Sequence, residues 1–153
     1  MPISTQNLKN NGYHLTASSI VIDKNSVLLV YHPKLKAWAQ PGGHVEGFEL
    51  PQYTCIRETQ EETGIVVTHV NSHFDDSNIT FLIPPLCTQI VESVEKGDLV
   101  YHLDFVYLCK PTQPQDLTLN NVDTKWVEFN TLPGLNLAKN VFDLVNLAKD
   151  RFV

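Results

Sequence analysis

Two β-branched, apolar runs near the start of the chain constrain its fold more than any other feature. The first covers residues 14–22 and the second covers residues 26–31, and the polar residues Asp23, Lys24 and Asn25 separate them. Two such runs on either side of a short polar turn predict a β-hairpin. The second run, SVLLVY, is almost continuously apolar, which is typical of a buried strand.

Two helices and three further strands are predicted downstream. Residues 50–63 predict a helix, because Pro51 suits a first turn and Gly64 suits the left-handed position that ends a helix. Apolar residues at helical spacing over residues 137–148 predict an amphipathic helix with one core face. Residues 32–43, with prolines and glycines at both ends, predict a loop. Together with strands expected at residues 65–70, 100–109 and 124–129, these elements predict a mixed α/β or α+β fold.

Composition narrows the classes of function. The chain has 153 residues, of which 42% are hydrophobic and 18% charged, so it fits one globular domain over residues 1–153. This composition excludes disordered, collagen-like and disulfide-scaffold proteins. A formal charge of −6 disfavours duplex nucleic acid as a partner, whereas a small phosphorylated substrate can bind if a cation mediates the contact. Three scattered cysteines, a polar N-terminus and no membrane-length apolar run predict a cytoplasmic protein with no membrane partner.

The chemistry concentrates in residues 42–65. On a helix, Glu58, Glu61 and Glu62 lie at positions i, i+3 and i+4, which places three carboxylates on one side. They occupy the last turns, where the helix dipole disfavours each negative charge by about 0.3–1 kcal/mol. Glutamate pairs are also common on solvated helix faces, but here a glycine pair upstream lets the backbone approach a ligand closely. The combination indicates a hard divalent cation, and Mg²⁺ is the natural candidate.

The same segment resembles the Nudix box, whose pattern is G-x5-E-x7-R-E-U-x-E-E-x-G-U, with U a bulky aliphatic residue. The match begins at Gly43 and ends at Ile65. The one departure is Thr59, where the family has an aliphatic side chain that packs the helix onto the sheet, so it bears on packing more than on catalysis. Every charged position of the pattern is present, at Glu49, Arg57, Glu58, Glu61 and Glu62.

The resemblance implies a fold, an activity and a cofactor. The fold is the Nudix-type α/β/α sandwich, an α+β arrangement with a mixed β-sheet between helices. The activity is hydrolysis of a nucleoside diphosphate linked to another moiety, with Mg²⁺ or sometimes Mn²⁺ as cofactor. The implied metal ligands are Glu58, Glu61, Glu62 and the carbonyl of Gly42.

The resemblance also assigns catalytic roles to Arg57, Glu58 and Glu61. Arg57 would orient the glutamates by charge-assisted hydrogen bonds, and Glu49 would support the geometry of the loop and helix. One carboxylate must accept a proton from the attacking water, and Glu58 is the candidate within the box. The family sometimes uses a base on a later loop, so the polar stretch before residue 100 offers the alternatives Glu92, Glu95 and Asp98.

Several other residues keep two interpretations. His44, directly after the glycines, suits either a phosphate contact or a structural role in the loop. His69 and His73 are not expected to form a zinc site, because a strand would separate them by roughly 13 Å. Cys55 is expected to be inert, and Asp104 has no assigned role. Four aromatic residues could stack on a base or belong to the core or rim: Trp38, Phe48, Phe74 and Phe81.

Three functions compete. The leading one is a Mg²⁺-dependent pyrophosphohydrolase acting on a nucleoside triphosphate, nucleotide-sugar, ADP-ribose or dinucleoside polyphosphate, and no motif selects among these. The alternative is a non-catalytic, nucleotide-sensing Nudix module, but the complete set of box glutamates favours the enzyme. A Nudix-fold isomerase of isoprenoid diphosphates ranks last, because no recognisable cysteine–glutamate pair is present. Family members are often dimers, so a homodimer is compatible with the resemblance.

Overall fold

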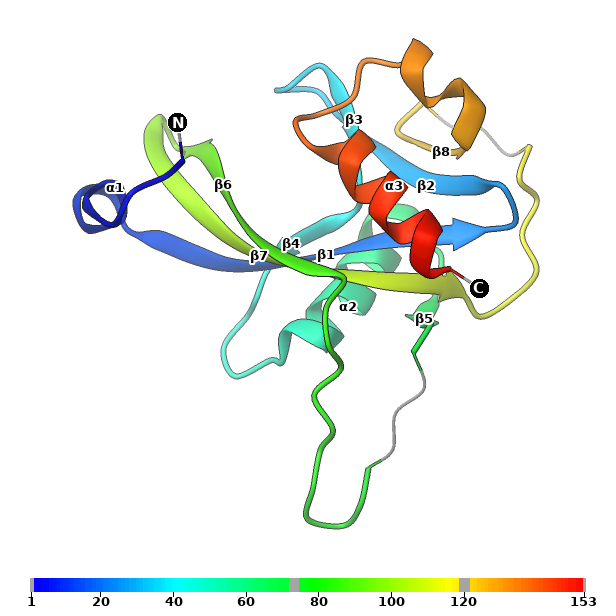
Figure 1. The fold of residues 1–153 in the computed structure, drawn as a ribbon, viewed down its shortest axis with the longest axis horizontal. Helices are drawn as coiled ribbons and strands as arrows, with labels where there is room; N and C mark the ends of the chain where they lie inside the picture. Colours follow the sequence, from blue (N-terminus) through cyan, green and yellow to red (C-terminus); the bar gives the residue numbers. More distant parts are fainter. Residues whose placement is uncertain (1, 72–74, 119–121, 153) are drawn as a thin grey trace.

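The computed structural model describes residues 2–71, 75–118 and 122–152, and it shows a mixed sheet with helices on both faces (Figure 1). In this described part of the chain, no helix is both long and apolar enough to cross a membrane. The strands are β1 (Tyr13–Asp23), β2 (Ser26–His32), β3 (Ala37–Ala39), β4 (Gly42–His44), β5 (Val67–His69), β6 (Cys87–Glu95), β7 (Asp98–Pro111) and β8 (Thr124–Glu128). The helices are α1 (Thr5–Asn11), α2 (Pro51–Thr63), α3 (Val141–Arg151) and a 3-10 helix, η1 (Phe129–Gly134).

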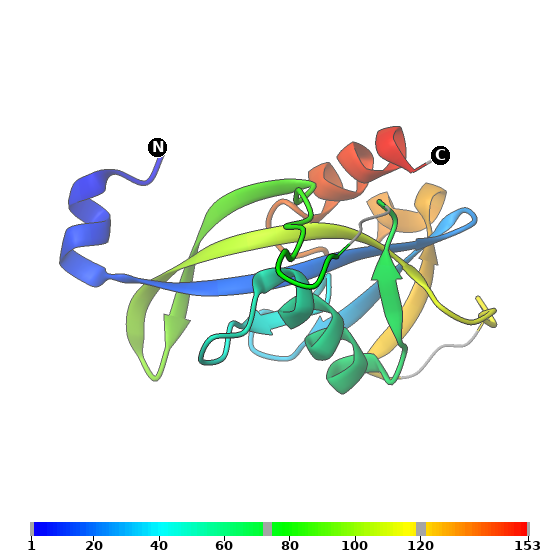
Figure 2. The ribbon, with the colours of Figure 1, turned by 90° about the horizontal axis from the view of Figure 1, so that it is seen from below.

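Strand β1 is the centre of the sheet. It pairs in parallel with β7, and it pairs antiparallel with β4 and, near the turn, with β2. β7 also pairs antiparallel with β5 and β6, and β2 pairs antiparallel with β3 and β8. The long β6–β7 hairpin curves away from the rest of the sheet on the side of α1 (Figures 1 and 2). The sheet is therefore mixed, with its parallel pair at the centre.

The side chains of β1 point alternately into two separate hydrophobic cores. Ile20 and Ile22 pack in the core that contains the inner face of α3, whereas Ala17 and Val21 pack in the core that contains Cys55 of α2. Figure 2 shows α3 and α2 on opposite sides of the sheet. Because successive strand residues point to opposite faces, a strand covered on both faces must be apolar at nearly every position. The expected α/β/α sandwich is confirmed.

The predicted hairpin and box helix are also confirmed. β1 and β2 are antiparallel around the turn residues Lys24 and Asn25. α2 begins at Pro51 and is followed by Gly64, which adopts a left-handed φ of 76° and donates its N–H to the carbonyl of Gln60 at 2.8 Å. Glycine takes this conformation without the steric penalty of a β-carbon. The other strands expected from the sequence appear as β5, β7 and β8, with shifted ends.

Three expectations differ from the structure. Residues 32–43, expected as a loop, contain β3 and β4, because each finds a partner strand in the β1–β2 hairpin. The polar stretch before residue 100, which offered a later loop, instead forms the end of β6, a two-residue turn and the start of β7, because these two strands pair in a hairpin. The last helix begins at Val141 rather than at residue 137, because Leu137 is extended and forms a β-bridge with Trp38. Each of these differences depends on pairing between separate segments.

Candidate active site

One face of α2 packs on the sheet and leaves its glutamates beside β4. Cys55 and Thr59 are fully buried on that packed face. The Thr59 hydroxyl donates to the carbonyl of Cys55 at 2.7 Å, so the polar atom is satisfied within the helix. The departure from the family pattern therefore occupies a packing position, as expected. Burial raises the pKa of the Cys55 thiol, but hydrogen bonds with Cys109, His69 and Ser19 outweigh burial and lower it below its usual value, so the inert role of Cys55 stays a prediction.

Arg57 links the box carboxylates. Its Nε and Nη2 donate to the two oxygens of Glu49 at 2.8 and 3.0 Å, a bidentate pair. Its Nη1 donates to Glu58 at 2.9 Å and to Glu61 at 3.1 Å. Its Nη2 also donates to the carbonyl of His44 at 3.1 Å. Arg57 thereby connects the loop after β4 with α2.

Glu49 fixes the entry of this helix. Besides its pair with Arg57, it accepts a hydrogen bond of 2.7 Å from the Thr54 hydroxyl. The hydrogen bonds from Arg57 lower the pKa of the Glu49 carboxyl to about 2. These contacts are those of a residue that supports loop and helix geometry, as the resemblance implies for Glu49.

Two glutamates of α2 lie against the glycines of β4. The N–H of Gly42 donates to Oε1 of Glu62 at 2.8 Å. A β-carbon on Gly43 would lie 2.4 Å from Cδ of Glu58, so only a glycine lets that carboxylate approach. Burial, together with the negative charges of Glu58 and Glu61, raises the pKa of the Glu62 carboxyl to about 7. The structure thus brings Gly42, Glu58 and Glu62 together, with Glu61 at the exposed edge through Arg57.

A groove of about 1090 Å³ begins at the same glycines and runs over β1, β4, β6 and β7. At its floor, Asp104 is 7% exposed and accepts hydrogen bonds from Thr16 Oγ1 at 3.0 Å and Ser18 Oγ at 2.8 Å. Burial raises the pKa of the Asp104 carboxyl. The buried Oε1 of Gln40, which also lines the groove, has no hydrogen-bond partner within the described residues. Sequence reasoning gave Asp104 no role and missed Gln40; the only signal was a charged residue inside an apolar strand.

The candidate aromatic residues do not line this groove where they are described. Trp38 contacts the ring of Tyr31, with centroids 5.3 Å apart, and Lys125 Nζ lies 4.2 Å from the centroid of the Trp38 ring. Phe48 is fully exposed, and Phe81 packs against the core beneath α2. Phe74 and His73 lie outside the described residues, while His69 is buried in β5, as its predicted strand requires.

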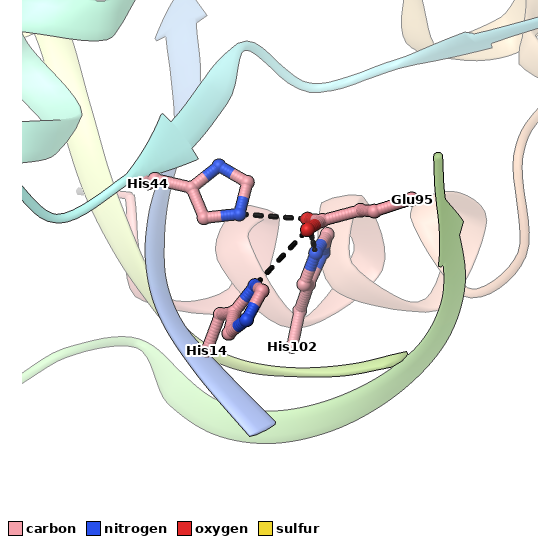
Figure 3. Close-up of side chains that lie close together, drawn as sticks. All are labelled: His14, His44, Glu95 and His102. Carbon is pink, nitrogen blue, oxygen red and sulfur yellow. Dashed lines mark hydrogen bonds and ion pairs between the residues drawn. The ribbon is translucent and has the colours of Figure 1, made fainter. Parts of the chain in front are cut away.

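The residues proposed as a later-loop base separate in the structure. Glu92 lines the groove from β6, and Asp98 is exposed at the start of β7. Glu95, at the end of β6, contacts His14, His44 and His102 (Figure 3). The side chain of His44 therefore contacts the carboxylate of Glu95. None of the three acids, all of which lie in the described part of the chain, forms a hydrogen bond or ion pair with Glu58. The sequence had not connected these three histidines, because they lie on three different strands.

Comparisons with known proteins agree with this geometry. A family model described as "NUDIX domain" matches residues 12–146. The chain is 42% identical over 99 residues to a "Probable DHNTP pyrophosphohydrolase" of Lactococcus lactis subsp. cremoris, covering 65% of this chain and 55% of that protein. It is 32% identical over 90 residues to an "8-oxo-dGTP diphosphatase" of Proteus vulgaris, covering 50% of this chain and 80% of that protein. The match thus spans only about half the length of the first relative.

A solved structure covers nearly the whole chain. The crystal structure of a NUDIX-family hydrolase from Clostridium perfringens has a TM-score of 0.73 and 31% sequence identity, covering 92% of this chain and 98% of that chain. The family-model match includes α2, which carries the carboxylate cluster, and β4, which carries the two glycines. The chain therefore belongs to the NUDIX domain family.

Proposed function

We propose that this protein is a Mg²⁺-dependent pyrophosphohydrolase of triphosphates that carry a bicyclic, purine- or pterin-like ring. The observation that carries the proposal is the position of Glu58 and Glu62 beside the two glycines at the end of a large groove, with Glu61 joined to the same cluster through Arg57. One end of the groove can hold phosphates near the carboxylates, and its polar floor can receive the ring. A Nudix enzyme needs both parts next to each other.

The donor set fits Mg²⁺. Glu58, Glu61 and Glu62 offer carboxylate oxygens, which are the ligands that Mg²⁺ prefers. The single positive charge of Arg57 is shared between Glu49, Glu58 and Glu61, so the cluster keeps excess negative charge for a cation. The Gly42 N–H points toward Glu62 and away from β1, and in a strand the carbonyl of a residue points to the same side as its N–H. This direction supports the Gly42 carbonyl as a further ligand.

Arg57, Glu58 and Glu61 have distinct roles in the proposed hydrolysis. Mg²⁺ held by Glu58, Glu61 and Glu62 would supply positive charge to neutralise phosphate oxygens and to lower the pKa of the attacking water. A new P–O bond forms from water, the P–O bond of the anhydride breaks, and pyrophosphate leaves. The Glu58 carboxylate, which contacts Gly43 and is oriented by Arg57, accepts the proton from the water. Glu61 shares the orientation by Arg57, and Arg57 keeps both carboxylates in place.

The polar floor supports a ring with hydrogen-bonding edges. Gln40 Oε1 is a buried acceptor that has no partner among the described residues, and Asp104 is a buried carboxyl between two hydroxyl donors. Buried polar groups gain stability when a partner satisfies them, so a ring that presents N–H groups would bind here. DHNTP, a pterin triphosphate, and 8-oxo-dGTP, a purine triphosphate, are the substrates in the names of the two curated relatives. Both molecules combine such a ring with a triphosphate.

A product-resolved assay tests the proposal. Purified protein is incubated with DHNTP, 8-oxo-dGTP, ADP-ribose or a dinucleoside polyphosphate, with and without Mg²⁺, and pyrophosphate and phosphate are measured separately. We expect Mg²⁺-dependent pyrophosphate release from the two triphosphates. Glu58→Gln should abolish this release, while Glu128→Gln, an exposed carboxylate on β8, should leave it unchanged. Binding of these triphosphates without hydrolysis would instead identify a sensing module.

A further inference from the structure

A second cluster of metal-type side chains lies outside the carboxylate site. His14 of β1, His44 of β4, Glu95 of β6 and His102 of β7 point toward one another (Figure 3). Each offers one ligand atom, and these atoms all lie within 4.8 Å of one another. The Glu95 carboxylate lies 2.6 Å from His102 Nε2, 2.7 Å from His44 Nε2 and 3.1 Å from His14 Nδ1. Three imidazoles thus converge on one carboxylate.

The strands bring these four side chains together only because the β6–β7 hairpin curls. His14 and His102 are direct partners in the parallel β1–β7 ladder. The β6 residue opposite His102 is Val91, four residues before Glu95. On a flat strand those four residues would place Glu95 roughly 13 Å along the sheet from His102. The curl instead closes Glu95 over the histidines, as Figure 3 shows.

We propose that His14, His44, His102 and Glu95 bind one transition-metal ion, for which Zn²⁺ is the best match. Three imidazole nitrogens and one carboxylate oxygen make a four-ligand set of the kind that zinc accepts in tetrahedral geometry. Zinc bonds of about 2.0–2.2 Å separate tetrahedral ligand atoms by roughly 3.4 Å, so the observed cluster needs only small side-chain movements. Mg²⁺ prefers oxygen ligands, so nitrogen donors separate this site chemically from the carboxylate site.

The cluster is also open to an incoming ion. The side chains of His14 and His44 are 50% exposed, and that of Glu95 is 30% exposed. The described residues contain one other candidate group, Cys55, His69 and Cys109, and all three are buried. That group offers three ligands rather than four, and His69 Nε2 already lies 2.8 Å from the carbonyl of Gln52. The histidine cluster therefore fits zinc better.

An ion at this place would fix one wall of the groove. The hairpin that carries Glu95 and His102 also supplies Gln89, Glu92 and Lys96 to the lining of the groove. A metal bond to Glu95 would fasten the end of this hairpin to β1 and β4. The role is structural and stands independently of the hydrolysis proposed above, because it uses none of the box carboxylates.

Zinc binding by the metal-free protein tests this inference without an activity readout. After treatment with a chelator, the protein is titrated with Zn²⁺ in millimolar Mg²⁺, which competes for oxygen ligands such as the box carboxylates, and bound zinc is counted by mass spectrometry. We expect one zinc ion per chain and a rise in the melting temperature. His102→Gln and Glu95→Gln should each weaken zinc affinity by about 100-fold or more, because they remove a direct ligand. Circular dichroism verifies that each variant is folded.

Two matched variants serve as controls. His32→Gln removes a groove histidine that is outside the cluster, and Cys109→Ala removes a ligand of the buried group. Both should bind zinc as the wild type does. The inference is wrong if the wild type binds no zinc at micromolar concentration, if Glu95→Gln and His102→Gln keep wild-type affinity, or if Cys109→Ala loses the ion.

The spectrum of Co²⁺ bound to the wild-type protein gives a second test that needs no variant. Cobalt in a site of nitrogen and oxygen ligands should show visible ligand-field bands alone. A thiolate-to-cobalt charge-transfer band would place the ion at Cys55 and Cys109 instead and would overturn the assignment. This measurement remains decisive even where a histidine substitution prevents folding.

Discussion

Alanine substitution should have different effects at the two adjacent glycines of β4: Gly42→Ala should lower stability, whereas Gly43→Ala should lower turnover. A β-carbon on Gly42 would lie 2.6 Å from the Ala17 carbonyl oxygen and 2.8 Å from Ser18 Cα, both backbone atoms of the central strand. A β-carbon on Gly43 would lie 2.4 Å from Cδ of Glu58, which is the end of a side chain. Neither glycine has a left-handed φ, so the effects come from these contacts rather than from backbone strain. Backbone cannot move aside easily, whereas a side chain can rotate.

The distances set the expected magnitudes. Carbon atoms in contact normally lie about 3.5–4.0 Å apart, so each new β-carbon is roughly 1 Å too close. Gly42→Ala should destabilise the fold by about 1–3 kcal/mol, as overpacking of a core does. For a chain of this size, that is a fall in melting temperature of about 2–12 °C. Gly43→Ala should displace the Glu58 carboxylate from Arg57, with little loss of stability but about 100-fold lower turnover, because a shift of about 1 Å misplaces the reacting groups.

The assay compares stability and turnover in the same preparations. Thermal unfolding is followed by circular dichroism without metal, and turnover is measured at saturating Mg²⁺ with the best substrate of the wild type. Gly134→Ala is the control, because a β-carbon there meets no atom within 4 Å. If Gly43→Ala keeps full turnover, the proposed role of Glu58 is wrong. If Gly42→Ala melts like the wild type, the close approach of β4 to β1 does not limit that position.

Four further predictions test the site and its support. Glu61→Gln and Glu62→Gln should each lower turnover by orders of magnitude, and full activity of either variant at saturating Mg²⁺ would contradict the metal assignment. Glu62→Gln should also stabilise the metal-free protein, because it removes a charge beside two other carboxylates. Glu49→Gln should reduce the free energy of unfolding by about 2–3 kcal/mol at pH 7. The pKa of Glu49 in the folded protein is lowered to about 2, so this stabilisation is complete above its ordinary pKa near 4.5 and disappears as the pH falls toward 2. Urea unfolding at several pH values should show that the difference in unfolding free energy between wild type and Glu49→Gln shrinks with falling pH. A difference that stays constant would rule the reasoning out. Gln52→Leu should destabilise by about 1–3 kcal/mol, since it leaves a buried N–H unpaired, and an unchanged urea midpoint would show that residues 81–83 do not need this anchor. Millimolar Mg²⁺ should raise the melting temperature of the wild type but not of Glu62→Gln, because a ligand of the native state stabilises it by mass action; an equal rise in both would place the ion elsewhere.

Local patterns in the sequence predicted the hairpin and the box helix because their determinants lie close together. Lys24 and Asn25 make a turn between two apolar runs, and Pro51 and Gly64 mark the ends of α2. The Nudix box runs from the end of β4 through one loop and α2, and the resemblance to it implied that Arg57 would orient the box glutamates. The contacts of Arg57 in the structure are compatible with that role, although the assignment of catalytic residues stays a prediction.

Segments with weak local patterns needed partners to be defined. β6 is partly polar along its length and becomes a strand through its ladder with β7. Gln52 is a polar residue that the sequence alone would place at the surface, but it is only 2% exposed. Its amide donates to the carbonyl of Phe81 and accepts from the N–H of Ile83, which holds that segment against α2. Asp104 is a charged residue inside an apolar strand, and only the structure explains it, because Thr16 and Ser18 of β1 donate hydrogen bonds to its carboxylate. Such roles depend on hydrogen bonds between residues far apart in the chain.

The sequence by itself indicated the family, through its resemblance to the Nudix box, and predicted the box helix with its carboxylates grouped on one side. The grouping could be predicted because a helix places residues three and four positions apart on one side, whatever surrounds it. Only the tertiary structure decided that two glycines touch Glu58 and Glu62, that a polar-floored groove begins there, and that three histidines meet Glu95. Those meetings depend on strand order, register and the curl of one hairpin, and short stretches of sequence do not encode them locally.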